Sequence, residues 1–187
     1  TIMRKNQPII GANDGASGVA VILELAKIMK KNPPPIGVSL VLFDAEDYGT
    51  SADSWSYAKG SQFFAQNIPI NYPMYAINLD MIADREPEFY IERYSYQQNP
   101  TLVLELWELA ESLNLDTFKK QAKYTIFDDH VPLYQMAGIP AIDIIDFDFP
   151  NEKINYHHTH QDIVQNCSPK GLGEVGTLML NHIYNIK

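Results

Sequence analysis

Apolar residues recur along this chain in two patterns, one with a helical period and one as short continuous runs. The helical spacing predicts helices over residues 17–31, 100–114 and 169–186, with shorter ones over 61–68 and 131–138. Lysines end the first of these, and Gly138 is placed to end the helix over 131–138.

The continuous apolar runs predict buried strands over residues 37–43, 73–82 and 139–145, and alternation over 88–94 predicts a further strand. Within the first run, VSLVLF (residues 38–43) is typical of a strand buried on both faces. Helices that alternate with apolar strands favour an α/β fold with helices on both faces of the sheet. We therefore expect a three-layer α/β sandwich with a mostly parallel, mixed central sheet.

The amino-acid composition of the chain argues against several classes of function and structure. The chain has 187 residues with 14 basic and 23 acidic side chains, a formal net charge of −9, which argues against a nucleic-acid partner. No apolar run is long enough to cross a bilayer. Cys167 is the single cysteine, so no disulfide can form within the chain. Residues 1–13 carry no helix or strand pattern, and we expect one domain over residues 1–187 that lacks its N-terminal part.

Acidic side chains gather where the predicted strands end. Asp44, Glu46 and Asp47 follow the first strand within four residues, and Asp80 lies near the end of the second. Carboxylates this close repel one another and resist desolvation unless a cation pairs with them. Ligands of α/β sheets bind beyond the carboxyl ends of the strands, which is where these acids fall.

A catalytic zinc site suits this arrangement, because it takes three His or carboxylate ligands and keeps one position open. The candidate ligands are Asp14, Asp47 and His158, with Glu46 as an unligated general base. Taken singly, Asp14 suits a helix N-cap, Asp47 a solvated turn and His158 an ordinary loop. Their joint position at strand ends favours the metal.

Five segments occur in an order that resembles the M28 family of zinc aminopeptidases, within it most closely the branch of animal-type glutaminyl cyclases and their bacterial relatives. The resemblance runs from about residue 8 to the C-terminus. The segments are GANDGASGVAVILELA, LVLFDAEDYG, INLDMI, DDHVPLYQMAGIPAIDII and HHT. It implies that the single domain is an M28-like zinc-dependent catalytic domain.

By that resemblance, Asp14, Asp47 and His158 match the zinc ligands and Glu46 matches the general acid/base. Asp80 matches a second-metal ligand in the aminopeptidases and a hydrogen-bonding acid in the cyclases. The remaining matches concern the substrate pocket. Asp128 matches an acid near the substrate of the cyclases, where peptidases more often have Ser, and Trp55 matches an aromatic wall of their pocket.

Two features depart from the family pattern. The family carries a His-x-Asp motif upstream of the GAND stretch, and no such motif precedes Asp14 here. Cyclases tend to have Trp immediately before the ligand histidine, and this chain has His157. The choice between His157 and His158 as the metal ligand therefore stays open.

Three functions are compatible with these residues. The first is a zinc-dependent glutaminyl-peptide cyclotransferase with one zinc, acting on peptide or protein N-termini. The second is an aminopeptidase with two zincs, and the third is a non-catalytic module that binds a peptide N-terminus. The family resemblance implies a secreted or periplasmic location, although no signal segment is visible, and the oligomeric state stays open. Ser-His-Asp chemistry is set aside because neither Ser17 nor Ser61 lies in a G-x-S-x-G elbow.

Overall fold

The computed structural model describes residues 7–69 and 71–186. The five predicted helices appear close to their expected bounds, and the described residues add one short α-helix, α3. In chain order the α-helices are α1 (Ala16–Lys31), α2 (Lys59–Gln66), α3 (Arg93–Gln98), α4 (Pro100–Ser112), α5 (His130–Ala137) and α6 (Pro169–Asn185). Single 3₁₀ turns are η1 (Ser54–Ser56) and η2 (Val164–Asn166).

The described strands form three pairs. The strands are β1 (Ala76–Asp80), β2 (Phe89–Ile91), β3 (Phe118–Ala122), β4 (Ala141–Ile145), β5 (Pro150–Asn151) and β6 (Ile154–Asn155). β1 pairs with β4 and β2 with β3, both parallel, while β5 and β6 form an antiparallel hairpin. The predicted mixed, mostly parallel character is confirmed.

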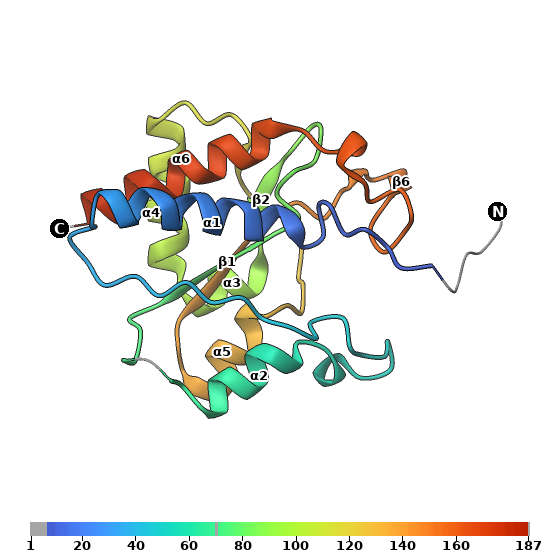
Figure 1. Ribbon diagram of the computed structural model, residues 1–187, viewed down its shortest axis with the longest axis horizontal. Helices are drawn as coiled ribbons and strands as arrows, with labels where there is room; N and C mark the ends of the chain where they lie inside the picture. Colours follow the sequence, from blue (N-terminus) through green and yellow to red (C-terminus); the bar gives the residue numbers. More distant parts are fainter. Residues whose placement is uncertain (1–6, 70, 187) are drawn as a thin grey trace.

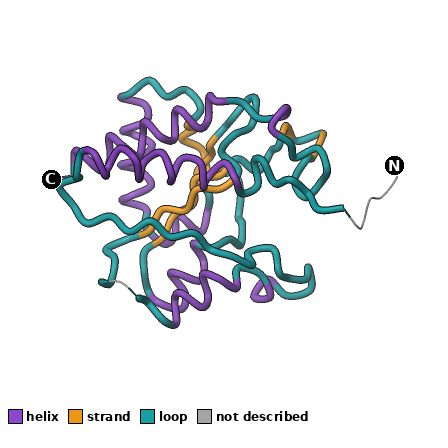
Figure 2. Tube along the Cα trace, viewed as in Figure 1, coloured by secondary structure: helices purple, strands orange, loops and turns teal. Residues whose placement is uncertain are grey.

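Helices cover both faces of the β1–β4 pair (Figures 1 and 2). α1 and α6 run side by side with α4 on one face, whereas α2 and α5 pack together on the other. β1 contacts α1, and β4 contacts α5. This layering follows from the sequence pattern, because a continuous apolar strand must be covered on both faces.

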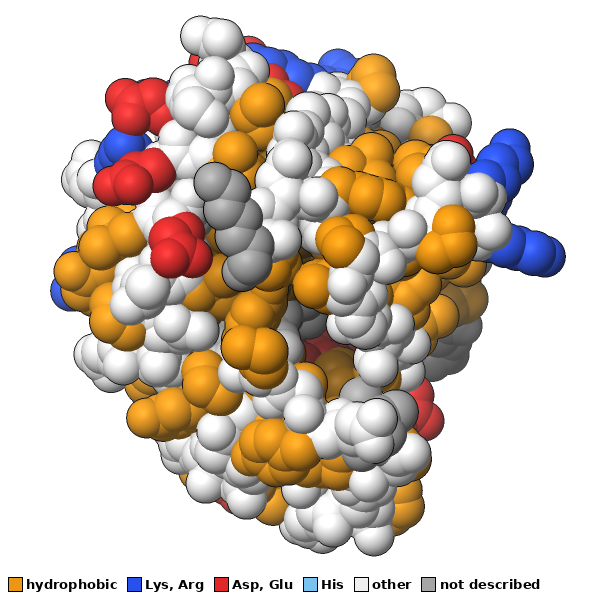
Figure 3. All heavy atoms as spheres, turned by 90° about the vertical axis from the view of Figure 1, so that its left-hand side faces the viewer, with side chains coloured by type: hydrophobic (Ala, Val, Ile, Leu, Met, Phe, Trp, Pro, Cys, Tyr) orange, Lys and Arg blue, Asp and Glu red, His pale blue; other side chains and the backbone are white. Residues whose placement is uncertain are grey.

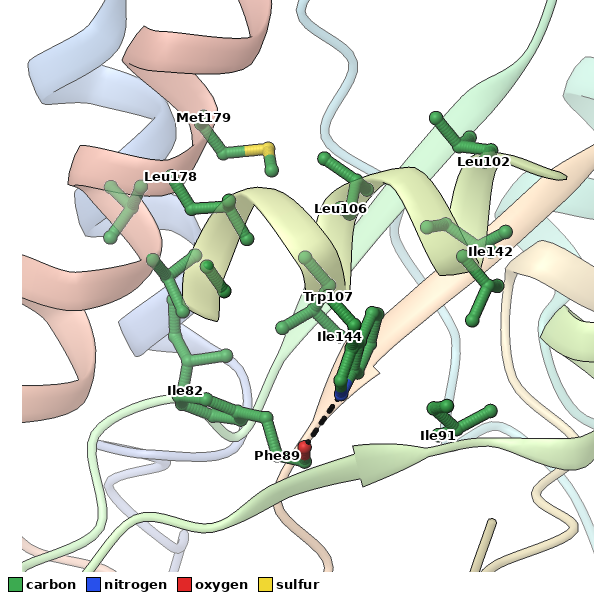
Figure 4. Close-up of a cluster of buried hydrophobic side chains, with 14 of the residues drawn as sticks. Ile82, Phe89, Ile91, Leu102, Leu106, Trp107, Ile142, Ile144, Leu178 and Met179 are labelled. Atoms are coloured by element: carbon green, nitrogen blue, oxygen red, sulfur yellow. Dashed lines mark hydrogen bonds between the residues drawn. The ribbon is translucent and has the colours of Figure 1, made fainter. Parts of the chain in front are cut away.

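The main core lies between β4 and the helices α1, α4 and α6 (Figure 4). Trp107 of α4 is 1% exposed and donates its indole N–H to the carbonyl oxygens of Phe89 (3.2 Å) and Lys119 (3.0 Å). One buried side chain therefore fastens α4 to both strands of the β2–β3 pair. Burial of such an aromatic side chain contributes about 2–3 kcal/mol.

Glycines let two helices approach the end of β1 closely. A Cβ atom on Gly18 of α1 would lie 1.9 Å from the Leu79 carbonyl oxygen, and one on Gly171 of α6 would lie 2.1 Å from that of Ile82. Only glycine fits such contacts with backbone. The starts of α1 and α6 are thereby held against the carboxyl end of β1.

The prediction of a buried strand over residues 37–43 is wrong for the described structure. The segment is extended but belongs to no strand, and Leu40 and Leu42 are 40% and 56% exposed. Across residues 7–69 and 71–186, no backbone–backbone hydrogen bond joins residues 38–43 to another segment. A strand exists only through its partner, and this run has the strand composition without the partner.

In Figure 3 apolar side chains gather around a hollow, and Lys and Arg side chains lie towards the margins of that face. No helix within the described residues combines the length and the hydropathy that a bilayer span requires.

Candidate active site and metal centre

A cleft of ≈ 610 Å³ lies at the carboxyl end of β1, between α1 and the loop that follows residue 43. Six acidic side chains from four segments line it. They are Asp14, Glu46, Asp47, Asp80, Asp128 and Asp129. The acids therefore meet in one cleft, as expected, although the segment before Glu46 and Asp47 is not a strand.

Asp14 lies in the turn before α1, with its side chain free to face the cleft. The N-cap of α1 is Gly15, and no side chain caps this helix end, so Asp14 is not a cap. Asp162 holds the turn from the far end of the chain: its carboxylate accepts the backbone N–H groups of Asn13 (2.7 Å) and Asp14 (3.1 Å). The Asp14 side chain is only 12% exposed.

The loop that carries Glu46 and Asp47 is fastened to the start of α2. The carbonyl oxygens of Glu46 and Ala45 accept the backbone N–H groups of Ala58 (2.7 Å) and Lys59 (3.1 Å). Ala45 has φ = 52°, a left-handed conformation that residues other than glycine adopt at a cost of about 1 kcal/mol or more. The Glu46 and Asp47 side chains both line the cleft.

His157 and His158 both face Asp14, although neighbouring side chains in extended backbone point in opposite directions. His158 has φ = 57°, and this left-handed turn stacks the two rings at 3.6 Å. His158 Nε2 lies 3.4 Å from Asp14 Oδ2 and 3.0 Å from Asp47 Oδ1. His157 Nε2 lies 3.6 Å from Asp14 Oδ2.

The donor atoms of Asp14, His157 and His158 lie within 4.8 Å of one another, close enough to share one metal ion, and Asp47 adjoins this group through His158. Ligands at 2.0–2.2 Å from a tetrahedral zinc lie about 3.3 Å from one another. The separations from His158 to Asp14 and to Asp47, 3.4 and 3.0 Å, match that spacing, and the donors are one imidazole and two carboxylates. A second group of candidate ligands, Asp128, His130 and Asp143, is buried, with Asp128 at the wall of the cleft and the other two behind it.

Burial and charge repulsion together raise the pKa values of two acids in the cleft. Burial, and then the charge of Asp47, raise the pKa of Asp14 to about 6. Burial and the charges of Asp128, Asp47 and Asp80 raise the pKa of Glu46 to about 10. Asp47 goes the other way, because its hydrogen bond with His158 lowers its pKa. A bound cation would relieve this repulsion.

Asp80 and Asp128 adjoin Glu46 from β1 and from the turn before α5. Burial raises both pKa values, and that of Asp80 is raised further by the charge of Asp128. Asp128 is 4% exposed, and its carboxylate accepts an N–H of the Asn78 side chain at 2.8 Å. Both acids therefore sit where they could influence a proton on Glu46.

Trp55 lies beside this cleft without being one of its lining residues. Its ring packs edge-on against Phe127 at 5.1 Å between centroids, and Phe127 directly precedes Asp128. The ring is 38% exposed. An aromatic side chain at the rim suits a wall for a substrate, as the resemblance implies.

Several polar residues near the site were missed by sequence reasoning. Asp162 holds the Asp14 turn, and Asn78 bridges Asp128 to Asp143. Asp143 lies inside β4 and is completely buried. The available signal was a polar residue inside an apolar strand, as in AINLD and AIDII.

The chain is similar in sequence and in structure to known proteins. The model of peptidase family M28 matches residues 3–183. Aminopeptidase YwaD of Bacillus subtilis (strain 168) is 28% identical over 182 residues, which are 93% of this chain. The chain spans 37% of the length of that relative.

Solved structures from two activity classes share the fold. The glutaminyl cyclase of Bacteroides thetaiotaomicron bound to N-acetylhistamine is 33% identical with a TM-score of 0.91, covering 100% of this chain and 68% of that one. The Tannerella forsythia glutaminyl cyclase is 37% identical with a TM-score of 0.91 (97% and 66% covered). A leucine aminopeptidase precursor from Bacteroides thetaiotaomicron VPI-5482 is 34% identical, also with a TM-score of 0.91 (100% and 67% covered).

Proposed function

This chain belongs to peptidase family M28, and from that membership we propose that it is a zinc-dependent glutaminyl-peptide cyclotransferase. Such an enzyme closes an N-terminal glutamine into pyroglutamate and releases ammonia. The observation that carries the proposal is Asp128, a buried acid beside Glu46 and Asp80, at a position where peptidases of the family more often have Ser. Likeness to the solved cyclases supports it.

Asp14, Asp47 and His158 would hold the zinc. His158 is preferred over His157 because its Nε2 atom lies near both carboxylates, whereas His157 lies near Asp14 alone. When bound, the ion supplies a positive charge that polarises the side-chain amide carbonyl of the glutamine. One ion suffices for this set.

Glu46 moves the proton in this mechanism. The α-amine nitrogen of the substrate attacks the side-chain amide carbon and forms the ring C–N bond, while Glu46 accepts a proton from that nitrogen. Glu46 then returns the proton to the departing nitrogen as the C–NH₂ bond breaks, and ammonia leaves. Its pKa is raised in the absence of a cation, and a zinc ion beside it would lower that pKa towards neutral pH, where a carboxyl group can both accept and release a proton.

Asp80 and Asp128 support this transfer as close neighbours of Glu46. Their charges contribute to its raised pKa, so they set how readily the carboxyl group gains and loses a proton. Acids this close titrate as a group. Trp55, packed on Phe127, would form a wall for the apolar part of the substrate.

An aminopeptidase is the second candidate, favoured by the likeness to aminopeptidase YwaD and to the leucine aminopeptidase precursor. In that reaction Glu46 would activate water against the first peptide bond, and Asp80 would help to hold a second zinc. For either activity we propose that the protein is exported from the cytoplasm and is secreted or periplasmic. Cell fractionation tests this location.

The variant Asp128→Ser separates the two candidates. In a cyclase it should lower kcat on a peptide with N-terminal Gln by about 100-fold, because an acid–base partner is lost. In an aminopeptidase it should leave the release of N-terminal Leu within a few-fold. Zinc content checks the same choice: one equivalent favours the cyclase, and two equivalents would contradict it.

A further inference from the structure

A connected series of buried polar side chains lies behind the cleft, on the side away from the substrate. Glu92, His130 and Asp143 are each 0% exposed, and none of them lines the cleft. They come from the start of α3, the start of α5 and the middle of β4. The proposed chemistry gives no task to Glu92 or His130.

Glu92 is the member of this series that is held by the most hydrogen bonds. One carboxylate oxygen accepts the backbone N–H groups of Tyr94 and Ile126, both at 3.0 Å. The other accepts the backbone N–H (2.6 Å) and the hydroxyl (2.8 Å) of Ser95. Burial alone would raise the pKa of Glu92, but its hydrogen bond with His130 and the backbone donors lower it to about 2. The group is therefore a carboxylate, which can only accept hydrogen bonds.

His130 is oriented by that carboxylate. Its Nε2 atom lies 3.2 Å from Glu92 Oε2, and facing an acceptor it must carry the proton that it donates. The other ring nitrogen, Nδ1, then points at Asp143 Oδ2, 3.8 Å away. Both of these atoms are buried and have no hydrogen-bond partner among the described residues. At 3.8 Å the two atoms are in contact without a hydrogen bond, and a proton on Asp143 Oδ2 would satisfy both once they approach to about 3 Å.

Asp143 connects His130 to the residues that line the cleft. Asp143 of β4 lies opposite Asn78 of β1 in the parallel strand pair. The Asn78 side chain donates to Asp143 Oδ1 (3.2 Å) and to Asp128 Oδ2 (2.8 Å). The backbone N–H of Asp129 binds the other oxygen of Asp128 at 2.5 Å. The orientation of Asp128 is therefore set from behind, through Asp143.

We propose that His130, anchored by Glu92, is a positioning residue: its Nδ1 atom fixes the Asp143 carboxyl group, which through Asn78 holds Asp128 facing Glu46. This inference rests on the proposed function, because Asp128 matters to turnover only as a neighbour of the group that moves the proton. A purely structural role would involve the Glu92 contact alone, whereas positioning requires the contact with Asp143.

Two variants separate these contacts. His130→Gln places its amide nitrogen near the former Nε2 and keeps the bond to Glu92, but leaves no atom opposite Asp143. His130→Asn places its polar atoms near the former Nδ1 and keeps the contact with Asp143, but loses Glu92. Glu92 stays satisfied in either variant, because four other donors bind it.

The expected order of kcat on an N-terminal Gln peptide is wild type, then His130→Asn, then His130→Gln. His130→Gln should lose about 10- to 100-fold, the range seen when a residue that orients a reacting group is removed. KM should stay within about twofold, since substrate contacts are untouched. Asn99→Ala, which removes the side-chain cap of α4, is the control: it lowers the melting temperature and leaves kcat unchanged.

A readout independent of turnover completes the test. In the ¹⁵N NMR spectrum of the metal-free wild-type protein, His130 should show a proton on Nε2. An unprotonated Nε2, the reverse order of kcat, or a zinc equivalent lost in His130→Gln would each overturn the positioning role. If wild-type protein turned over neither Gln nor Leu peptides, the proposed function would fail, while the NMR spectrum would still decide where the His130 proton lies.

Discussion

At the residue scale, the site is built from side chains whose backbone is held by distant parts of the chain. Asp162 fixes the Asp14 turn, and the first amides of α2 fix the loop of Glu46. The left-handed residues Ala45 and His158 lie in the two segments that bring Asp47 and His158 together. Their conformational strain persists because the surrounding hydrogen bonds hold it in place, as is common at functional sites.

The candidate site could be predicted from the sequence as a set of acids and a histidine, because such residues rarely follow buried strands without a reason. The supporting residues could not. Glu92, Asn78 and Asp162 act through contacts between segments far apart in the chain, and nothing in their local sequence specifies the partner.

Replacing Glu46 tests the assignment of the general base. Glu46→Gln should lower kcat by about 100-fold or more, because the amide cannot accept and return the proton. Zinc content should be unchanged, since Glu46 is not one of the proposed ligands. Glu108→Gln, on the exposed side of α4, is the matched control and should match wild type. Wild-type turnover by Glu46→Gln would remove Glu46 from the mechanism.

At the element scale, the agreement between sequence and structure depends on whether an element finds its partners. α1, α4 and α6 were predictable because an amphipathic helix needs only a core to cover. Residues 37–43 have strand composition, yet no described strand pairs with them. β3 was not predicted because its sequence, FKKQA, has three polar residues in succession and no apolar run. Its last three residues are exposed, as suits an edge strand.

Glycine contacts at the helix starts give an element-scale prediction. Gly171→Ala should lower the free energy of unfolding by about 1–3 kcal/mol, because the new methyl group meets the Ile82 carbonyl oxygen. Gly176→Ala, in the same helix with open space around it, should instead raise stability by about 0.5–1 kcal/mol. Urea unfolding of both variants measures this. Equal effects would show that the close approach of α6 to β1 is not a constraint.

At the scale of the whole molecule, the acidic side chains make stability depend on pH and on bound cations. Some of them lie outside the cleft. Burial raises the pKa of Asp84 to about 6 and that of Asp146 to about 7, above the ordinary value near 4. A carboxyl group with a raised pKa in the folded state favours folding while it is protonated, so this contribution is lost as pH rises from about 4 to about 7.

The variant Asp84→Asn tests that linkage. Relative to wild type it should become more stable by on the order of 1–2 kcal/mol between pH 4 and pH 7, because an amide does not ionise. Urea unfolding at several pH values gives the difference between the two proteins, in which any effect of zinc loss cancels. A difference that stays constant with pH would mean that Asp84 does not titrate in this range.

Removal of zinc should destabilise the protein, because Asp14, Glu46 and Asp47 then repel one another without a cation between them. At free zinc 100-fold above the dissociation constant, binding contributes about 2.7 kcal/mol, which corresponds to roughly 5–10 °C in melting temperature. Thermal unfolding with and without a chelator measures this. Asp14→Asn should show a smaller shift, and an identical melting temperature with and without chelator would argue against a zinc site.

The central claim is that the acids of the cleft serve cyclisation of N-terminal glutamine. The most direct measurement is mass spectrometry of two peptides after incubation with the zinc-loaded protein, one peptide beginning with Gln and the other with Leu. The account predicts loss of ammonia from the Gln peptide and an unchanged Leu peptide. Release of the N-terminal residue from either peptide, without loss of ammonia, would contradict it and favour the aminopeptidase.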